Sequence, residues 1–243
     1  MSSIKSHEIA QFQKDSLEWW NENGPFAPLH KMNPARLTFI RDDILKIFAK
    51  EKSDSKPYKG LSFLDIGCGG GLLCEPLARL GGSVTGVDAD NQAIEVAARH
   101  KSQDLDITYI NGAAEDLVKK GAQFDVVCAL EIVEHVDNPK AFLENCASLV
   151  KPGGLLFVST INRTAQSLLQ AKFLAEYVLR WVPAGTHDWK QFMKPSEVLA
   201  PLEKVGLKPL NISGIGYTPL RDEFFLTQGS VKTNYILSAQ KPA

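Results

Sequence analysis

Apolar residues follow two different spacings along this chain, and the change of spacing divides it into parts. Within residues 7–22, apolar side chains such as Ile9, Phe12 and Trp20 recur at roughly helical intervals, which predicts a helix. Glycine and proline residues then interrupt the pattern. A second helix is expected to begin near Pro34, because proline is tolerated in the first helical turn, where its missing N–H leaves no hydrogen bond unmade.

Beyond these helices, short apolar runs alternate with amphipathic stretches. The apolar runs have the character of buried strands, and they comprise residues 61–67, 83–89, 107–111, 124–130 and 154–160. Helical patterns over residues 72–81 and 91–101 separate the first three of these predicted strands. This alternation is typical of βαβ units and predicts a parallel sheet. Residues 207–217 and 233–241 supply two further strands, which we expect to form an antiparallel pair at the sheet edge.

The expected fold is therefore α/β and Rossmann-like, with a mostly parallel, seven-stranded sheet flanked by helices. We expect one domain over residues 1–243. Its expected parts are an N-terminal helical extension (1–58), a cofactor-binding core (60–160), an inserted helical lid (163–190) and C-terminal edge strands (205–241). In the lid, Leu169, Phe173, Tyr177 and Trp181 recur at helical spacing and predict an apolar face.

The composition is that of a soluble globular protein, with 44% hydrophobic and 23% charged residues. The 27 basic and 28 acidic residues nearly balance, so the charge indicates no nucleic-acid partner. The four cysteines form no C-x-x-C pair, which favours reduced core thiols in a reducing compartment. No apolar stretch approaches the ~20 residues of a membrane span, and the first residues carry no targeting signal.

A glycine-rich loop follows the first predicted strand, in the sequence LDIGCGGGLLCEPLARLG. Gly67, Gly69 and Gly71 permit a tight turn and let a ligand approach the backbone where the next helix begins. Asp88 ends the following strand, where a carboxylate can accept hydrogen bonds from both ribose hydroxyls. Together these features predict a cofactor that contains adenosine, either a dinucleotide or another adenosine cofactor.

Asp65, two positions before the first glycine, discriminates between these cofactors. Its carboxylate would repel a pyrophosphate and favour a cofactor with a positive charge, such as S-adenosylmethionine. Asp65 thus argues against a nicotinamide-dependent oxidoreductase, which is one alternative function. The other interpretation of Asp65 is a strand-end acid bonded to loop amides. After the third strand, Ala114 and Glu115 are placed to meet the adenine edge through backbone and side chain.

The sequence EIVEH follows the fourth strand and places Glu131, Glu134 and His135 at i, i+3 and i+4. If the chain is helical there, the three side chains lie on one side and could bind a divalent metal. The alternative is a solvated helix start. Ligands of open α/β sheets bind outside the carboxyl ends of the strands, and this position favours a functional role.

The motifs LDIGCGGG, GVDA, FDVVCALEIVEHV and LVKPGGLLFVSTINR resemble the successive motifs of class I S-adenosylmethionine-dependent methyltransferases. The flanking sequences narrow the resemblance. WWNENGPFAPLHKMNPARLTFIRD, VPAGTHDWKQFMKPSEV and NYILSAQ are similar to the ubiquinone-biosynthesis O-methyltransferase family. The resemblance covers nearly the whole chain.

This resemblance implies S-adenosylmethionine as the cofactor, with Arg36, Gly67, Asp88 and Leu130 at the family's cofactor positions. Arg36 would approach the methionine carboxylate, a bidentate task suited to a guanidinium. Gly67 would leave space at the loop, Asp88 would bind the ribose, and Leu130 would lie beside the methionine part. Without the resemblance, the sequence favours an exposed helix arginine at Arg36.

The resemblance also implies a polyprenylated catechol or hydroquinone as the substrate that accepts the methyl group. A neutral phenol is a weak nucleophile, with a pKa of about 10. A divalent cation bound to both oxygens would lower that pKa. Glu131, Glu134 and His135 would bind it, with Mg²⁺ expected ahead of Mn²⁺ or Zn²⁺. Alternatively, Glu131 contacts the cofactor and His135 acts as the base. His187, after the lid, is a second candidate base.

Polyprenylated substrates partition into membranes, so we expect peripheral membrane contact, with the outer face of the lid at the bilayer. The alternative is a lid whose apolar face packs on the core. The expected location is the matrix side of the mitochondrial inner membrane, and the alternative is the bacterial cytoplasm beside the inner membrane. Other ubiquinone-biosynthesis enzymes are expected partners in a complex. The alternative function is an inactive protein with the methyltransferase fold that serves as a scaffold for such a complex. The intact glycine loop, Asp88 and EIVEH argue against this alternative.

Overall fold

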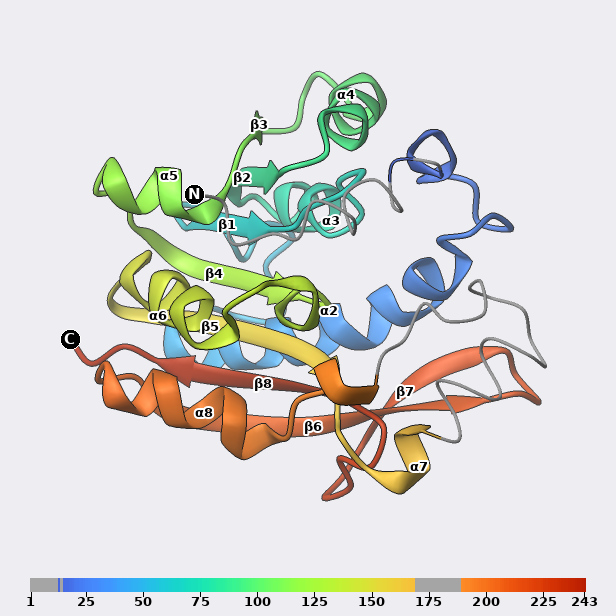
Figure 1. The fold of residues 1–243 in the computed structure, drawn as a ribbon. Helices are drawn as coiled ribbons and strands as arrows, with labels where there is room; N and C mark the ends of the chain where they lie inside the picture. The colour runs from blue at the N-terminus through green and yellow to red at the C-terminus, as the bar shows by residue number, and fades with distance from the viewer. Residues whose placement is uncertain (1–12, 14, 169–188) are drawn as a thin grey trace.

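One mixed sheet forms the centre of the molecule (Figure 1). The computed structural model describes residue 13, residues 15–168 and residues 189–243. Within them the strands are β1 (Ser62–Ile66), β2 (Ser83–Asp88), β3 (Ile107–Asn111), β4 (Phe124–Leu130), β5 (Val150–Ile161), β6 (Lys208–Thr218), β7 (Glu223–Thr227) and β8 (Asn234–Gln240). They are hydrogen-bonded in the order β3-β2-β1-β4-β5-β8-β6-β7.

Helices cover both faces of this sheet. The α-helices are α2 (Ala27–Ile47), α3 (Cys74–Arg79), α4 (Asn91–His100), α5 (Ala114–Lys119), α6 (Pro139–Ser148), α7 (Ala165–Ser167) and α8 (Pro195–Lys204). Short 3-10 helices are η1 (Ser16–Glu18), η2 (Val133–His135) and η4 (Trp189–Gln191). Helices α2, α3 and α4 pack on one face, and α5, α6 and α8 pack on the other.

Burial on both faces explains the uninterrupted apolar runs of the central strands. Successive side chains of a strand point to opposite faces. In β1, Phe63 packs toward α2 and α3, whereas Leu64 belongs to the cluster beneath α5, α6 and α8. In β5, Phe157 likewise belongs to the cluster beneath α2 and α3, and Leu156 belongs to the cluster beneath α5, α6 and α8. A parallel sheet covered on both faces has no polar side, so apolar side chains can follow one another along its strands.

The predicted Rossmann-like fold is confirmed, with one additional strand. Strands β1 to β5 pair in parallel, and β8 pairs antiparallel with both β5 and β6, as expected for the C-terminal strands. The seven-stranded expectation was wrong, because Glu223–Thr227 forms an eighth strand, β7, on β6. This five-residue strand, EFFLT, is exposed or half-buried along its whole length.

The N-terminal helices differ from their predicted bounds. Of the helix expected over residues 7–22, the described part contains one helical residue, Gln13, and the three-residue η1, followed by turns. Helix α2 begins at Ala27 rather than near Pro34, with Pro28 in its first turn and Pro34 inside it. A proline inside a helix removes one backbone hydrogen bond. Here the buried face of the helix, which includes Phe39 and Ile44, packs on the sheet and offsets that loss.

Helix α2 is attached to the sheet by a buried polar contact. Asp43 accepts hydrogen bonds from Ser238 Oγ of β8 at 2.5 Å and from Asn211 Nδ2 of β6 at 3.3 Å. The carboxylate is therefore satisfied by the two strands on which the helix lies. This contact fixes the position of α2, which carries Arg36.

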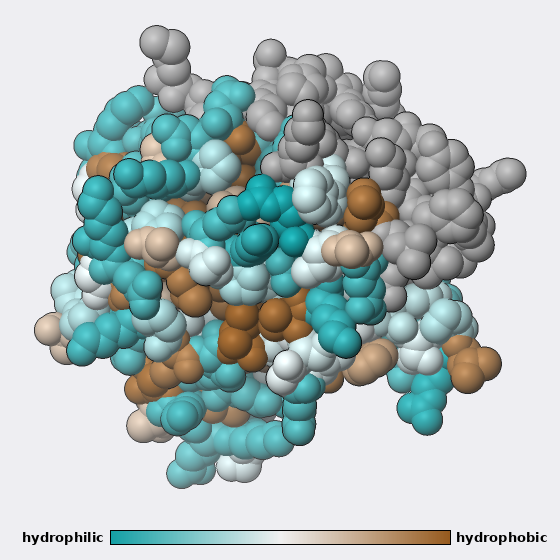
Figure 2. All heavy atoms as spheres, turned by 60° about the horizontal axis from the view of Figure 1, so that its bottom comes forward, coloured by the Kyte–Doolittle hydropathy of each residue, from teal (hydrophilic) through white to brown (hydrophobic). Residues whose placement is uncertain are grey.

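Most of the predicted lid (163–190) lies outside the described residues, and so does any apolar face at Leu169 to Trp181. Figure 2 shows one face of the molecule, on which hydrophilic residues predominate and hydrophobic residues gather near the middle. Among the helices that the structure describes, none is both long and apolar enough to cross a membrane.

Candidate functional site

The main cavity of the described structure lies at the carboxyl ends of β1, β2 and β4, which are neighbours in the sheet. Parallel strands place the residues that follow them at a common edge, where open α/β folds bind ligands. Helix α2 and the segment before it close the other side. The cavity is lined by Trp19, Leu29, Asn33, Arg36, Asp65, Gly67, Cys68, Leu72, Leu73, Asp88, Ala89, Asp90, Ala93, Leu130, Glu131, Ile132 and His135.

The glycine loop contributes Gly67 and Cys68 to the lining of this cavity. Gly67 has φ +74°, a conformation that favours glycine, and its N–H donates to Val87 O at 2.8 Å. A Cβ atom there would lie 2.3 Å from Ile132 Cδ1. Gly69 has φ +50°, and its N–H donates to Asp88 Oδ2 at 2.8 Å. Gly69 therefore does not line the cavity. Its N–H instead holds the Asp88 carboxylate in place.

Asp88 lies at the end of β2 and faces the cavity. Its Oδ1 accepts from Asp90 N at 2.8 Å, in addition to the bond from Gly69. Burial raises the pKa of Asp88, and the two amide bonds oppose this rise. Each carboxylate oxygen keeps a further lone pair for a ligand hydroxyl. The fixed orientation suits the ribose-binding role that the sequence predicts.

Asp65 is almost fully buried in the cavity wall. Cys74 Sγ donates to its Oδ2 at 3.4 Å. Desolvation raises the pKa of this carboxyl to about 7, with the nearby charge of Asp88 adding to the rise. Within the described residues, no loop amide donates a hydrogen bond to Asp65, so the strand-end alternative has no support there. A cation in the cavity would favour the ionised form of this carboxylate.

Arg36 reaches the cavity from α2 and is buried, not an exposed helix arginine. Its Nη2 lies 3.1 Å from Glu131 Oε1. Among the described residues, none accepts a hydrogen bond from the buried Arg36 Nε. A buried guanidinium N–H without an acceptor is costly, and an anionic ligand group would satisfy it.

The EIVEH sequence does not form the helical turn on which the three-ligand prediction depended. Glu131 has φ +52°, in the left-handed region, and only Val133–His135 form a 3-10 turn. Both oxygens of Glu131 already accept from protein donors: Ser159 Oγ at 2.7 Å and Asn234 Nδ2 at 3.3 Å. Within the described part of the chain, no group of three His, Cys, Asp or Glu side chains is arranged to hold a metal ion.

The other two residues of that sequence have different environments. Glu134 is buried, and desolvation raises its pKa to about 7, opposed by the neighbouring His135 and reinforced by Glu131. It is not among the residues that line the main cavity. His135 is half-buried and does line the cavity, so it is the candidate base of the described region. His187, the second predicted base, lies outside the described residues.

A narrow slot adjoins the main cavity, and both contain Gly67, Asp88 and Ile132. Ala114 and Glu115, at the start of α5, line this slot, which is the position expected beside an adenine edge. Leu130, the last residue of β4, lines the main cavity. The predicted residues that the structure describes therefore gather around two adjoining spaces, except for Gly69, Gly71 and Glu134.

Sequence reasoning missed three polar or aromatic residues of the site: Asp90, Trp19 and Asn33. Asp90 is the N-cap of α4, where its Oδ1 accepts from Gln92 N at 2.9 Å, and it also faces the cavity. An acid directly before a helical pattern was the available signal. Trp19 lines the cavity from the N-terminal segment. No local signal identified it, because apolar spacing assigned its neighbour Trp20 to a helix face.

Comparison with known proteins gives a consistent set of relatives. Residues 29–212 match a family model described as a methyltransferase domain. A ubiquinone biosynthesis O-methyltransferase from Caulobacter vibrioides is 48% identical over 241 residues, which cover 98% of this chain and 95% of that protein. A protein of the same name from Chelativorans sp. is 46% identical, with 99% and 95% covered. Both organisms are bacteria, so these relatives give no support to the expected mitochondrial location.

Solved structures of other methyltransferases share the fold. The magnesium protoporphyrin IX methyltransferase from Synechocystis PCC 6803, with bound SAH, superposes with a TM-score of 0.59 at 19% identity, covering 87% of this chain and 85% of that one. A possible histamine N-methyltransferase from Thermotoga maritima gives a TM-score of 0.57 at 17% identity, with 85% and 97% covered. At these identities the likeness is one of fold.

Proposed function

Because the chain belongs to the ubiquinone biosynthesis O-methyltransferase family, we propose that it transfers the methyl group of S-adenosylmethionine to a phenolic hydroxyl of a polyprenylated catechol or hydroquinone. The observation that carries this proposal is the presence of a guanidinium and a separate carboxyl group in the wall of one cavity. Arg36 and Asp65 are both buried and both line it.

The amino-acid end of S-adenosylmethionine carries a carboxylate and an ammonium, and the adjoining sulfur is also cationic. Arg36, whose Nε has no acceptor among the described residues, suits the carboxylate. Asp65 suits the positive charges, which would lower its raised pKa. Asp88 suits the ribose hydroxyls, and the slot beside Ala114 and Glu115 suits the adenine. A pyrophosphate would instead meet Asp65 and Asp88, two carboxylates, which argues against a nicotinamide cofactor.

When bound, S-adenosylmethionine supplies an electrophilic methyl group. The bond from the phenolic oxygen to the methyl carbon forms as the carbon–sulfur bond breaks, and the phenolic proton passes to a base. His135 is the proposed base, because it is an imidazole that lines the cavity. The remaining acceleration comes from alignment of the two reactants by the cavity walls.

The EIVEH residues do not fit a metal ion in this arrangement, because Glu131 pairs with Arg36 and accepts from Ser159. We therefore derive no step through a divalent cation here. The alternative from the sequence was direct contact between Glu131 and the cofactor. We propose instead that Glu131 orients Arg36 toward the cofactor.

The prenyl chain of the substrate, peripheral contact with a membrane and assembly with other enzymes of the pathway remain part of this proposal. They rest on the family and on the physical expectation that a polyprenyl chain partitions into a bilayer. The bacterial relatives favour the bacterial alternative for the location of this activity.

Two measurements test the proposal together. Titration calorimetry is expected to show binding of S-adenosylhomocysteine and none of NAD, and mass spectrometry is expected to show one methyl group added to a short-chain prenylated catechol. Binding without methyl transfer to any catechol or hydroquinone would support the scaffold alternative. Binding of NAD in preference to S-adenosylhomocysteine would overturn the proposal.

A further inference from the structure

Two adjacent tryptophans both contact the glycine loop. Trp19 lies directly on the loop: a Cβ atom at Gly69 would be 2.3 Å from its indole ring, and one at Gly70 would be 2.4 Å from Trp19 Cβ. The Trp19 ring is also stacked on Phe26, with centroids 3.8 Å apart and planes inclined by 7°. Because Trp19 lines the main cavity, it forms a wall of the proposed cofactor site.

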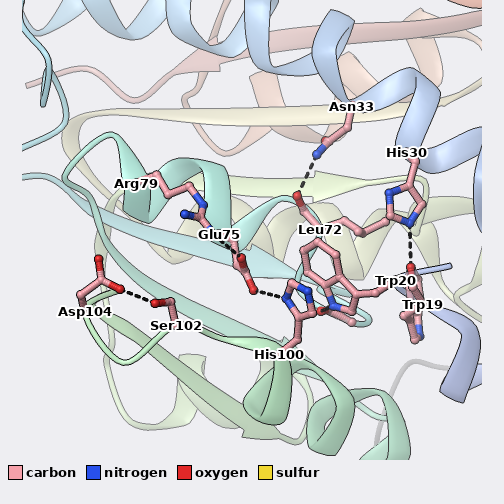
Figure 3. A network of polar contacts seen from close by, with 11 residues as sticks. Trp19, Trp20, His30, Asn33, Leu72, Glu75, Arg79, His100, Ser102 and Asp104 are labelled. Carbon is pink, nitrogen blue, oxygen red and sulfur yellow. Dashed lines mark hydrogen bonds and ion pairs between the residues drawn. The ribbon is translucent and has the colours of Figure 1, made fainter. Parts of the chain in front are cut away.

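Trp20 contacts the same loop and lies beside His100 (Figure 3). Its Nε1–H donates to Gly70 O at 2.9 Å. Its ring is stacked on His100, with centroids 3.5 Å apart and planes inclined by 8°. His100 is the last residue of α4, so this stack joins the N-terminal segment to one of the helices that cover the sheet.

Glu75 fixes the imidazole on which Trp20 stacks. Its Oε1 lies 2.6 Å from His100 Nδ1 and its Oε2 lies 3.0 Å from Arg79 Nη2. A carboxylate can only accept, so Nδ1 carries the proton of the bond to His100. Glu75 is 3% exposed, whereas His100 is 41% exposed. The buried carboxylate therefore determines the orientation of a ring at the surface (Figure 3).

Other contacts of the described residues also attach the segment that carries both tryptophans. It consists of η1 and turns, so a helix does not hold its backbone in place. Ser16 Oγ donates to Asp90, and His30 Nε2 donates to Trp19 O at 2.8 Å. Segments held by a few discrete side-chain contacts open at a lower free energy than core strands do.

We propose that Trp20 and His100 are positioning residues that hold Trp19 against the glycine loop and thereby set how fast the cofactor enters and leaves. The inference rests on the proposed function, because it takes the cavity as the cofactor site. Neither residue touches the reacting atoms in this arrangement, since neither lines the cavity. Their loss should change cofactor exchange and leave the methyl-transfer step nearly unchanged.

Two variants separate the contacts. Trp20→Phe keeps an aromatic ring for the stack on His100 but removes the donor to Gly70 O. His100→Ala keeps that donor but removes the stack and the link to Glu75. The matched control is Trp189→Phe, which removes an indole donor to Thr164 O at 3.3 Å, on η4 and away from the lining of the cavity.

The measurement is the release rate of radiolabelled S-adenosylhomocysteine during a chase with unlabelled ligand, beside KM for S-adenosylmethionine and kcat. A hydrogen bond or a stacked aromatic pair contributes about 1 kcal/mol, which corresponds to a roughly fivefold change. We expect both variants to release the ligand about fivefold faster and to show a KM raised to a similar extent, while kcat stays within about twofold. The control should match wild type.

Because both contacts hold one segment, the double variant should accelerate release by less than the product of the single effects. Wild-type release rates in both single variants, with unchanged melting temperatures, would overturn the inference. So would a fall in kcat with KM unchanged, because the residues would then act on the transfer step. Failure of wild type to bind S-adenosylhomocysteine at all would instead overturn the proposed function.

Discussion

Arg36 on α2 and Glu131 after β4 form an ion pair in the wall of the cavity, with 3.1 Å between Nη2 and Oε1. Ser159 Oγ donates to the same Glu131 oxygen at 2.7 Å, so β5 holds the carboxylate in place. The pair leaves Arg36 Nε directed to no acceptor among the described residues. Glu131 thus balances the charge of a guanidinium that still has donors for a ligand.

Arg36→Lys tests whether the guanidinium binds the cofactor carboxylate. Lysine keeps the charge but lacks the planar fork that donates two parallel hydrogen bonds. Hydrogen bonds to charged groups contribute about 1.5–3 kcal/mol, so we expect S-adenosylhomocysteine to bind roughly 10- to 100-fold more weakly by calorimetry. Arg41→Lys is the matched control, because Arg41 lies on the same helix and does not line the cavity. Equal affinity in the two variants would contradict the role of Arg36.

Glu131→Gln tests whether Glu131 serves Arg36 or a metal ion. If it balances Arg36, the substitution leaves a buried guanidinium without its counter-charge, and the free energy of unfolding should fall by roughly 1–3 kcal/mol even with a chelator present. Denaturant unfolding in EDTA measures this change. Glu203→Gln, at an exposed position on α8, is the control and should have little effect.

A role for Glu131 only as a metal ligand predicts the opposite result. Two carboxylates near each other without their cation repel, so neutralising one should leave the chelated protein as stable as wild type or more stable. The same samples report on catalysis: methyl transfer before and after chelation shows whether a divalent cation assists the reaction at all.

Asp65 predicts a pH dependence of stability. Its pKa is raised by burial to about 7 in the folded protein, from 3.8 ordinarily. Between these values the folded chain binds more protons than the unfolded chain, so this residue lowers the free energy of unfolding as the pH rises through that window. Asp65→Asn removes the effect. The melting temperature of Asp65→Asn minus that of wild type should therefore become more positive between about pH 5 and about pH 8.

The control for this series is Asp116→Asn. Asp116 is exposed, and its pKa is lowered by Lys119, so it stays ionised throughout the range and its substitution should give a flat difference. Because a neutral amide cannot offset a cation, Asp65→Asn should also weaken binding of S-adenosylhomocysteine. A relative melting temperature that is flat or decreases with pH would show that Asp65 is ionised in the free protein at neutral pH.

Asp43→Ala should destabilise the fold without removing any residue of the cavity. The substitution leaves Ser238 and Asn211 without their acceptor in the interface of α2 with β8 and β6. Loss of a buried polar partner costs about 1–3 kcal/mol. Chemical denaturation measures the change, and Asp42→Ala, at the exposed neighbouring position, is the control. A variant as stable as wild type would show that apolar packing alone holds α2.

Local sequence signals were sufficient to predict several residues of the cavity lining. The glycine loop, Asp65 and Asp88 each follow or end a strand that an apolar run identifies. Parallel strand order then brings their carboxyl ends together without further information. The family resemblance added Arg36 and Leu130, and both line the cavity. Helical spacing for EIVEH was the wrong local choice, because Glu131 takes a left-handed conformation that directs it to Arg36 and Ser159.

The sequence by itself determined the alternation of strands and helices, the parallel core and the carboxylates at its edge. These depend on spacing and residue type within short stretches, which report local conformation and burial. Only the tertiary structure decided the pairing of Arg36 with Glu131, the placement of Trp19 on the glycine loop and the addition of β7 to the sheet. Those contacts join residues far apart in the chain, and packing of all the elements together selects them.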